Sequence, residues 1–287
     1  MTTVSQCLLC HEPTQMVELC HVSFGSIVRC QQCALVRVSP FRSSEQLATL
    51  HASLEYFQHP YFEARRDLAR EESVAKQRAL LSTLIDGSSL KKIRLLDIGC
   101  DTGALLVVAR DEFGMDVMGV EVSREASTVA QQQNGLNVVN DFNELRGLRG
   151  TFDVITLVDV IEHVANPAAL LEEVSQLLRA GGKVYIITPN HDALINKLGL
   201  ILHRVLGTRA RSLIEKLYIP YHEFYFTEAT LARLVKQSGL QIERQTMKEF
   251  PLNEFGHGLI LKLGLVPIFA AQRLTRRQTL QELVAVK

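Results

Sequence analysis

The amino-acid sequence predicts an α/β protein with a doubly wound, mostly parallel sheet and a small cysteine-rich unit at its N-terminus. Two observations support this prediction. Short apolar strands alternate with helical segments from residue 92 onward, which is the pattern of a parallel sheet with helices on both faces. Ahead of that pattern, five of the six cysteines lie within the first 33 residues. The length of 287 residues is sufficient for one large domain with a small appendage.

The composition is that of an ordinary globular protein, with 47% apolar and 22% charged residues, which excludes disordered and low-complexity classes. Lys and Arg number 31, as do Asp and Glu, so the net charge is zero and a broad basic surface for nucleic acid is not expected. The N-terminus has no basic stretch followed by an apolar one, and no apolar run approaches a membrane-spanning length. We therefore expect a cytoplasmic protein without a signal peptide, in which reducing conditions disfavour disulfides.

Residues 1–40 predict a zinc ribbon. Two Cys-x-x-Cys pairs, separated by 19 residues, supply four thiolates: Cys7, Cys10, Cys30 and Cys33. Each such turn directs both sulfurs to one side, so the two pairs suit one tetrahedral zinc ion. The alternative is a set of buried apolar cysteines, but so short a segment has little core without a metal. Four cysteines leave no open coordination position, so the zinc is expected to be structural, with Cys20 and His21 as spare ligands.

A helical connector is expected over residues 41–90. Ser39-Pro40 ends the ribbon, and Ser43 and Gln46 have the spacing of a capping box. One apolar helical face follows, formed by Leu47, Leu50, Leu54 and Phe57. A second, charged helix is expected from about Tyr61 to Ile85.

The α/β pattern occupies residues 91–250, and residues 251–287 form a C-terminal extension. Strands are expected at 93–98, 116–121, 137–139, 152–158 and 183–188. Helices are expected to begin near Gly103, Ser123 and Asn166. The last of these has a capping Asn followed by Pro and is ended by Gly181-Gly182. Parallel sheets bind ligands at the carboxyl ends of their strands, so the functional site is expected there.

Glycines and acidic residues follow the first three strands. The loop 99–103 allows a sharp turn and a close approach of a ligand to the backbone. Glu121 ends the second strand, where a carboxylate can bind two ribose hydroxyls, and Asp141 with Phe142 follows the third, beside a purine. These features indicate an adenosine-containing cofactor. The G-x-G-x-x-G spacing of a dinucleotide fold is absent, and an Asp on the loop suits a cationic sulfonium better than a pyrophosphate.

The segments LLDIGCDTGALL, GVEVS, VVNDFNEL, FDVITLVDVIEHVANP and LLRAGGKVYIITPN, in this order, resemble a class I S-adenosylmethionine-dependent methyltransferase over residues 92–244. The resemblance implies a Rossmann-like fold and S-adenosyl-L-methionine as cofactor. Asp101 stands where the family usually has Gly, and it is expected to contact the cofactor with the rest of its loop. The other implied contacts are the methionine end for Asp97, Gly99 and Gly103, the ribose for Glu121, the adenine for Asp141 and Phe142, and the pocket border for Asp159 and Val160.

The whole layout, with a Cys-x-x-Cys head before the methyltransferase core, resembles bacterial zinc-ribbon methyltransferases of sugar, surface-polysaccharide and natural-product pathways. This resemblance implies a small hydroxylated molecule or a sugar conjugate as the methyl acceptor. The sugar C-methyltransferases carry a further C-terminal domain for which this chain is too short, so O- and C-methylation both stay open. A non-catalytic adapter with a vestigial cofactor fold is the rival from another class, and the intact set of cofactor residues disfavours it.

Two polar clusters are candidates for the chemistry, Asp159-x-x-Glu162-His163 and Tyr221-His222-Glu223. The acceptor must be aligned and must lose a proton, and a neutral imidazole suits proton removal near pH 7. His222 resembles the active-site His of the sugar methyltransferases, so we expect it to be the general base. The alternative is a His that fixes its loop by hydrogen bonds. Glu162 and His163 are further catalytic candidates, although a Glu-His pair at this turn can also only brace it.

Asp159, Glu162, His163 and His222 also resemble the metal ligands of two other groups, the ubiquinone-pathway O-methyltransferases and the small-RNA 2′-O-methyltransferases. Carboxylates and imidazoles together suit a second divalent metal that binds substrate oxygens. A metal-assisted O-methyltransferase of a quinone-like or lipid-linked substrate is therefore an alternative function. Zero net charge counts against an RNA substrate.

Residues 191–220 insert many apolar residues and several basic ones between the fifth strand and the His222 loop. They predict either a lid over the substrate or a surface for a lipid-linked one. Residues 259–269 form a comparable apolar stretch. The main expectation is that these segments are helices that pack on the core or on a second subunit. Peripheral membrane contact and a homodimer are thus both kept open.

Overall fold

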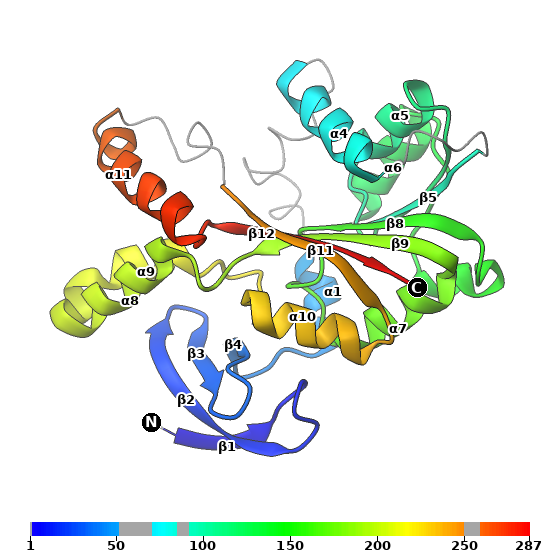
Figure 1. Ribbon diagram of the computed structural model, residues 1–287. Helices are drawn as coiled ribbons and strands as arrows, with labels where there is room; N and C mark the ends of the chain where they lie inside the picture. The colour runs from blue at the N-terminus through cyan, green and yellow to red at the C-terminus, as the bar shows by residue number, and fades with distance from the viewer. Residues whose placement is uncertain (1, 52–70, 85–91, 250–258) are drawn as a thin grey trace.

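A computed structural model describes residues 2–51, 71–84, 92–249 and 259–287. The described chain forms two sheets, with helices on both faces of the larger one (Figure 1). The smaller sheet lies at the N-terminal end, beneath the larger one in this view. The C-terminus lies at the end of a strand of the larger sheet.

The smaller sheet is antiparallel and has five strands. In spatial order these are β1 (Thr2–Gln6), β2 (Pro13–Val22), β3 (Gly25–Cys30), β4 (Val36–Ser39) and β10 (Phe224–Tyr225). The fifth strand comes from a distant part of the chain, because Phe224 pairs with Arg37 and Tyr225 with Val36. The N-terminal sheet is therefore completed by the segment that directly follows His222.

The larger sheet has seven strands and confirms the predicted doubly wound, mostly parallel fold. Their spatial order is β11 (Gln241–Lys248), β12 (Leu280–Val286), β9 (Leu178–Pro189), β8 (Phe152–Val158), β5 (Arg94–Ile98), β6 (Asp116–Val120) and β7 (Val138–Val139). The pairs β9–β8, β8–β5, β5–β6 and β6–β7 are parallel, whereas β12 is antiparallel to both of its neighbours. The order of β5 and β8 in the sheet sets a switch point at which ligands bind.

Helices cover both faces of this sheet. The described helices are α1 (Ser44–His51), α4 (Glu71–Leu84), α5 (Ala104–Asp111), α6 (Arg124–Gln132), η1 (Phe142–Leu148), α7 (Pro167–Leu177), α8 (Leu194–Leu206), η2 (Gly207–Ala210), α9 (Arg211–Leu217), α10 (Glu228–Gln237) and α11 (Leu259–Thr275). Helices α4 and α5 lie on one face and α7 and α10 on the other (Figure 1). Neighbouring residues of β5 point to opposite faces of the sheet. Leu95 packs in the core on the side of α4 and α5, and Leu96 packs in the core on the side of α7 and α10.

The predicted helix caps at Ser43 and Asn166 are confirmed. Ser43 and Gln46 form the expected reciprocal pair, since the Gln46 amide donates to Ser43 Oγ and the Ser43 amide donates to Gln46 Oε1. Asn166 caps α7 with Pro167 in its first turn. The described part of the predicted 61–85 helix is α4, and Leu54 and Phe57 lie outside the described residues.

Two details at the C-terminal side differ from the sequence analysis. Helix α7 ends at Leu177, and Gly181-Gly182 lies within β9 instead of ending the helix. The segment 251–287, expected as an extension, contributes β12 between β9 and β11. Its side chains explain why this strand is central, since Leu283 and Ala285 pack into one core and Val284 into the other.

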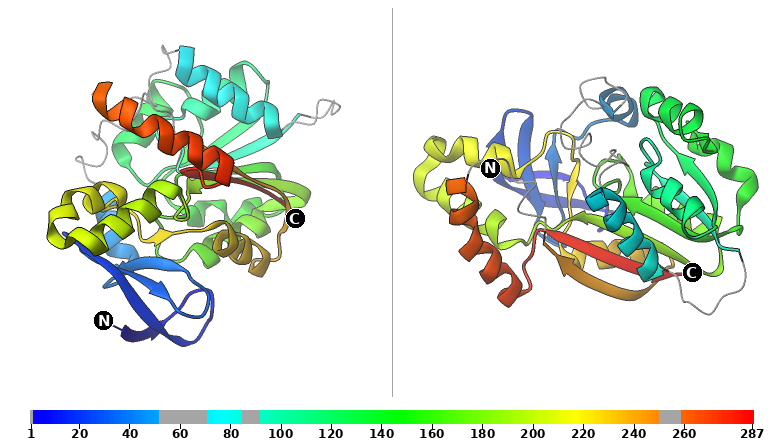
Figure 2. Two further views of the ribbon diagram at one scale, coloured as in Figure 1. Left: turned by 60° about the vertical axis from the view of Figure 1, so that its left-hand side comes forward. Right: turned by 90° about the horizontal axis from the view of Figure 1, so that it is seen from above.

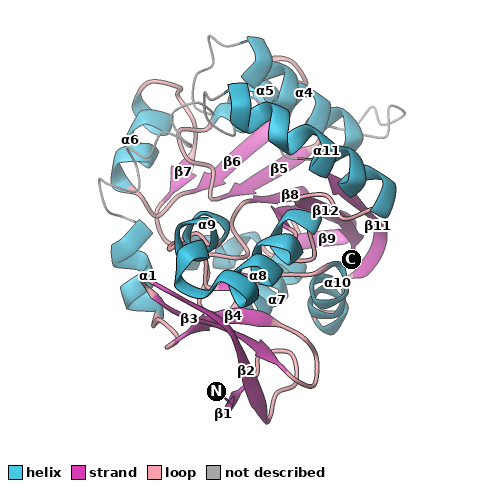
Figure 3. Cartoon of the chain, turned by 90° about the vertical axis from the view of Figure 1, so that its left-hand side faces the viewer, coloured by secondary structure: helices cyan, strands magenta, loops and turns pink. Residues whose placement is uncertain are grey.

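The insertion 191–220 forms α8, η2 and α9, which lie against the N-terminal sheet (Figures 2 and 3). Its contact is apolar, because Ile214 and Tyr218 share a core with Val22, Ile27 and other residues of β2, β3 and β4. The opposite side of α8 exposes five apolar side chains, those of Leu198, Ile201, Leu202, Val205 and Leu206. None of the described helices is long and apolar enough to cross a membrane.

Candidate active site

A cavity of about 570 Å³ opens at the carboxyl ends of β5, β6 and β8. This volume lies in the range of about 300–1,000 Å³ that is usual for small-molecule sites. Eight of the residues predicted from the sequence line it: Asp97, Gly99, Asp101, Glu121, Phe142, Asp159, Val160 and His163. Ser44 and Leu47 of α1 add a wall that the sequence analysis did not anticipate.

The loop after β5 explains the positions of its glycines. Gly99 has a φ of +73°, and a Cβ there would lie 2.5 Å from Val160 Cγ2. Gly103 has a φ of +84° at the start of α5 and lies outside the cavity lining, where a Cβ would overlap Leu136. Asp101 has a φ of +51°, a left-handed conformation that Asp tolerates better than most side chains. The backbone conformation thus accounts for the Gly that the family usually has at this position.

Asp97 lies at the end of β5 and is only 5% exposed. Burial raises the pKa of its carboxyl to about 7, and the charges of Glu121 and Asp101 act in the same direction. Thr156 Oγ1 donates to Asp97 Oδ1 over 2.6 Å and opposes that shift. Three acidic side chains therefore face one end of the cavity, and a cationic group placed there would be stabilised by all of them.

Glu121 links the loop after β5 to the loop after β6, in which it lies. Its Oε2 accepts from the amide of Asp101 over 2.9 Å, and its Oε1 accepts from the amide of Ser123 over 2.7 Å. Both carboxylate oxygens have a second lone pair that can accept from a ligand hydroxyl. The carboxylate is thereby oriented by the backbone before any ligand arrives.

Asp141 and Phe142, which are neighbours in sequence, lie in different environments. Phe142 lines the cavity, whereas Asp141 does not. Asp141 Oδ1 accepts from the amide of Asn143 over 2.8 Å, and Glu144 Oε1 accepts from the amide of Asp141 over 3.2 Å. These bonds form a capping box at the start of η1, so the exposed carboxylate of Asp141 holds the helix that carries Phe142.

Beside the cavity, Glu162, His163 and His222 form a buried group. One ligand atom from each lies within 4.8 Å of the others. The imidazole rings of His163 and His222 are 4.6 Å apart and nearly perpendicular, at 87°. Asp159, which the sequence analysis included as a fourth metal ligand, lines the cavity but is not part of this group.

Hydrogen bonding fixes the tautomer of His163. Its Nδ1 lies 2.9 Å from the carbonyl oxygen of Tyr221. A carbonyl can only accept, so Nδ1 carries the proton and donates it. In the neutral ring, Nε2 is then the nitrogen whose lone pair can accept a proton or bind a metal.

The His222 loop is held by backbone bonds to the turn after β8. The amides of Glu223 and Phe224 donate to the carbonyl of Glu162 over 2.8 and 3.1 Å. Glu223 is fully buried and pairs with Arg42. Burial raises the pKa of Glu223, and the guanidinium groups of Arg42 and Arg37 oppose that shift. The sequence analysis did not select Arg42, because no local pattern connects residues that are 181 positions apart.

The insertion contributes a further, half-buried histidine near the same loop. His191 Nε2 lies 3.1 Å from the hydroxyl of Tyr218, and burial lowers the pKa of His191 to about 4, so this ring is neutral. No residue of the insertion lines the cavity described above. The insertion packs against the N-terminal sheet and donates from the amides of Leu194 and Ile195 to the C-terminal segment, and its role as a lid stays a prediction.

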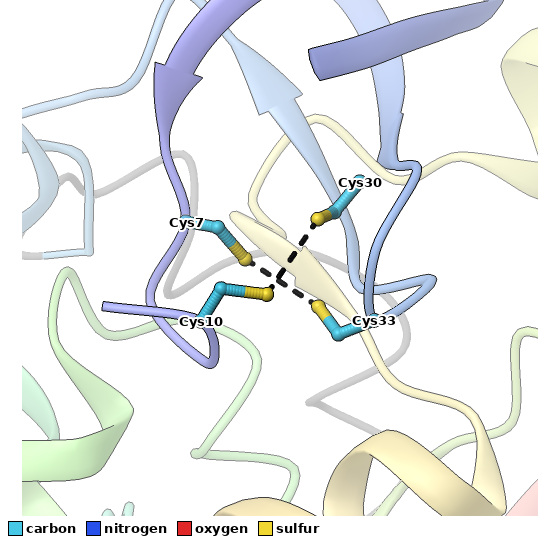
Figure 4. A group of neighbouring side chains, drawn as sticks. All are labelled: Cys7, Cys10, Cys30 and Cys33. Carbon is cyan, nitrogen blue, oxygen red and sulfur yellow. Dashed lines mark hydrogen bonds between the residues drawn. The ribbon is translucent and has the colours of Figure 1, made fainter. Parts of the chain in front are cut away.

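The four ribbon cysteines form a second, separate cluster (Figure 4). Cys7 Sγ lies 3.5 Å from Cys33 Sγ, and Cys10 Sγ lies 3.9 Å from Cys30 Sγ. A tetrahedral site with Zn–S bonds of about 2.3 Å requires sulfurs about 3.8 Å apart, so the residues present fit zinc. The interaction with Cys33 lowers the pKa of Cys7 to about 5, which favours a thiolate. The two spare ligands lie elsewhere, since Cys20 is buried against the insertion and His21 contacts Ser26.

A methyltransferase-domain family model matches residues 61–245, which is more than half of the chain. The chain belongs to this family. It is a class I S-adenosylmethionine-dependent methyltransferase, and the strand order and the cavity at the switch point are those of such an enzyme. This outcome confirms the resemblance of residues 92–244 to a class I S-adenosylmethionine-dependent methyltransferase.

Among curated relatives, the chain is similar to ubiquinone biosynthesis O-methyltransferases. That of Nitrosococcus oceani is 30% identical over 169 residues, which cover 55% of this chain and 68% of the relative. That of Thiobacillus denitrificans is 28% identical over 162 residues, which cover 53% of this chain and 66% of the relative. The chain thus spans about two thirds of the length of these relatives.

Solved structures share the fold at low sequence identity. A S-adenosylmethionine-dependent methyltransferase from Archaeoglobus fulgidus superposes with a TM-score of 0.51 at 18% identity, covering 80% of this chain and 100% of that one. Phosphoethanolamine N-methyltransferase 2 of Haemonchus contortus, solved with S-adenosyl-L-methionine, gives a TM-score of 0.57 at 18% identity and covers 88% of this chain and 61% of that one. These similarities support the fold alone.

Proposed function

We propose that this methyltransferase transfers a methyl group to an oxygen of a small hydroxylated molecule. One observation carries the proposal. His163 lines the cofactor cavity and at the same time belongs to the buried group with Glu162 and His222. A proton acceptor thus adjoins the cavity in which the methyl group would be held. The names of the curated relatives, which are O-methyltransferases, support oxygen as the acceptor atom.

The strand-end residues are the proposed cofactor site. S-adenosyl-L-methionine supplies a methyl group on a cationic sulfonium. Asp97 and Asp101 provide negative charge toward that cation, with Gly99, Asp159 and Val160 shaping the wall and Gly103 allowing the turn into α5. Glu121 accepts from the ribose hydroxyls, and its two backbone donors hold it in the required orientation. Phe142 packs on the adenine, while Asp141 contributes by capping η1.

The acceptor site consists of the two imidazoles and Glu162. We assign removal of the acceptor proton to this pair of histidines, with His163 nearer the cavity because it lines it. His222, which the sequence favours as the base, packs edge-on against His163. Each imidazole that takes a proton would be stabilised by the carboxylate of Glu162 in the same group. The acceptor site thus makes two contributions: it positions the acceptor and removes its proton.

A metal-assisted O-methyl transfer is the second candidate, and the close approach of the three ligand atoms favours it. Glu162, His163 and His222 would hold the ion. One carboxylate and two imidazoles suit a transition metal such as Mn²⁺, Fe²⁺ or Zn²⁺ better than Mg²⁺. Such an ion would lower the pKa of a bound acceptor hydroxyl. The metal content of the wild type and of Glu162→Gln distinguishes this candidate, because only the metal-assisted enzyme would lose a second equivalent of metal.

Product mass spectrometry tests the main proposal. The protein is incubated with methyl-labelled cofactor and a panel of hydroxylated sugars, nucleotide sugars and phenols, and the labelled atom is located by fragmentation. Label on an oxygen is the expected result, and label on carbon or nitrogen would overturn it. Absence of S-adenosylhomocysteine binding in calorimetry would instead favour the non-catalytic adapter.

The ribbon and the outer surface complete the proposal. The four ribbon cysteines hold one structural zinc, for which their spacing is the support. The exposed apolar side of α8 supports the predictions of peripheral membrane contact and of a homodimer, since either partner would cover it. Zero net charge supports a small-molecule acceptor over a nucleic acid.

A further inference from the structure

The N-terminal sheet and the His222 loop are joined by more than the short β4–β10 pairing. The amide of Val38 in β4 donates to the carbonyl of Glu223 over 3.0 Å. Glu223 in turn donates its own amide to the carbonyl of Glu162 over 2.8 Å. A single buried residue therefore connects the ribbon, the His222 loop and the turn after β8.

The partner of Glu223 on the ribbon side is Arg42, three residues after the last ribbon strand. Its guanidinium Nε pairs with Glu223 Oε1, and its backbone amide donates to Glu223 Oε2 over 3.3 Å. Its Nη2 donates to the carbonyl of His222 over 3.3 Å. The carboxylate of Glu223 is fully buried and Arg42 is 22% exposed, so solvent screens this pair only weakly. Arg42 thus binds both Glu223, the residue next to His222, and the backbone carbonyl of His222 itself.

The same short segment reaches the cofactor cavity. Ser44 and Leu47, which begin α1 directly after Arg42, line that cavity. Residues 42–47 therefore touch both halves of the site. The planar guanidinium suits a contact with two acceptors at once, which a single ammonium group cannot reproduce.

We propose that Arg42 is a positioning residue for methyl transfer, which fixes His222 through Glu223 and the His222 carbonyl and makes the ribbon end of the chain a part of the acceptor site. This inference rests on the proposed function. Arg42 acts through His222 and makes no contact with the acceptor. Displacing an active-site group by about 1 Å can lower a rate by about 100-fold, so the expected effect is on turnover and not on cofactor affinity.

The test uses Arg42→Met combined with Glu223→Gln in the full chain. The pair is replaced by neutral groups of similar shape, so neither Arg42 nor Glu223 leaves its partner charged and buried. The buried guanidinium of Arg37 keeps its hydrogen bonds to the Val38 carbonyl and Ser5 Oγ. Turnover should fall about 10- to 100-fold, while the melting temperature and the affinity for S-adenosylhomocysteine stay close to wild type. Arg42→Lys keeps the charge but loses one of the two contacts, and it should give an intermediate kcat. Should the double variant not fold, the Lys variant decides the question.

Imidazole signals of His222 in nuclear magnetic resonance provide a readout that needs no acceptor. They should shift in both Arg42 variants. The matched control is Arg179→Met with Asp153→Asn, which removes another arginine–carboxylate pair at the opposite end of β8 and should leave them unchanged. Unshifted His222 signals with wild-type kcat would overturn the positioning role, as would a cofactor affinity that falls in parallel with kcat. Failure of the proposed function is distinct, because it would show as a wild type that methylates no oxygen acceptor.

Discussion

The two halves of the site are assembled in opposite ways. The cofactor half takes its main residues from consecutive strand ends between Asp97 and Val160. The acceptor half joins Glu162 and His163 to His222, and a bond from Arg42 holds that loop. The first half follows from the regular progression of a parallel sheet, in which successive strands end at one edge. The second depends on pairing between segments far apart in the chain.

The halves also differ in charge. Asp97, Asp101 and Glu121 face the cofactor half, where a cation is bound in the proposed function. The acceptor half has two imidazoles beside one carboxylate, that of Glu162, and a proton is to be removed there. This separation places a cluster of three carboxylates on one side and the two imidazoles on the other. It predicts that variants of one half change affinity for the cofactor and that variants of the other change turnover.

The largest effect is expected when the ribbon is disrupted, since that tests how far the acceptor half depends on it. Cys7→Ser with Cys33→Ser should release zinc and unfold the N-terminal sheet, because structural zinc supplies on the order of 10 kcal/mol of folding free energy. Turnover should be lost with it, since β4 and Arg42 hold the His222 loop. Elemental analysis and circular dichroism measure the outcome.

The control for the ribbon variant is Cys20→Ser, because Cys20 is buried but lies outside the four-cysteine group. It should keep its zinc. Purified wild-type protein without stoichiometric zinc would contradict the structural zinc. An active zinc-free variant would show that the acceptor half does not need the ribbon.

The next effect separates the halves directly. His163→Ala and His222→Ala should each lower turnover by about 10²–10⁴-fold, the range for loss of a general base or its partner. Affinity for S-adenosylhomocysteine should stay within a few-fold of wild type for His222→Ala, since His222 does not line the cavity. Methyl-transfer assays measure the turnover, and calorimetry measures the affinity for S-adenosylhomocysteine. Full activity of both variants would leave alignment alone as the source of catalysis.

The contrast between the halves also explains what could be predicted from the sequence. Strand ends, the glycine loop and the caps at Ser43 and Asn166 follow from short-range patterns, and the structure contains them. The extent of β9 was missed because Gly181-Gly182 reads as a helix stop, although Gly181, with a φ of +72°, lies inside the strand. Burial of β12 on both faces depends on its neighbours β9 and β11, which local periodicity does not contain.

The same reasoning applies to single site residues. Phe142 and Asp141 read equally well as adenine contacts, yet a capping box turns the carboxylate toward η1. Glu223 belongs to a polar cluster that the sequence singles out, but Arg42 carries no motif, and their pairing exists only once β4 and β10 have joined. Residues recruited by tertiary pairing are thus the ones that sequence patterns do not identify.

A smaller effect should come from the carboxylates of the cofactor half. Glu121→Ala should weaken S-adenosylhomocysteine binding about 10- to 100-fold, because a charged acceptor of hydrogen bonds contributes about 1.5–3 kcal/mol. Asp141→Ala is the matched comparison at the next strand end. It should weaken binding by only a few-fold, through loss of the η1 cap. Equal losses in the two variants would show that Asp141 contacts the cofactor directly.

The smallest effect concerns the protonation of Asp97. Burial raises the pKa of this carboxyl to about 7, well above the value of about 4 for an unfolded Asp. Between these values the folded protein without ligand binds more protons than the unfolded one, so Asp97 makes the stability fall as the pH rises from about 4 to 7. A cationic ligand binds to the ionised carboxylate of Asp97, so it favours the deprotonated form that the empty folded protein disfavours. Affinity for S-adenosyl-L-methionine should therefore be about tenfold weaker at pH 6 than at pH 8, with a proton released on binding.

Calorimetry in two buffers of different ionisation enthalpy measures that proton, and Asp97→Asn provides the control. The amide keeps an oxygen that can accept from Thr156, so the end of β5 should stay folded while the pH dependence of affinity disappears. His222→Ala should retain the pH dependence, because His222 lies outside the cofactor cavity. If the dependence were lost in His222→Ala and kept in Asp97→Asn, the titrating group would belong to the acceptor half, and the division of charge between the two halves would be wrong.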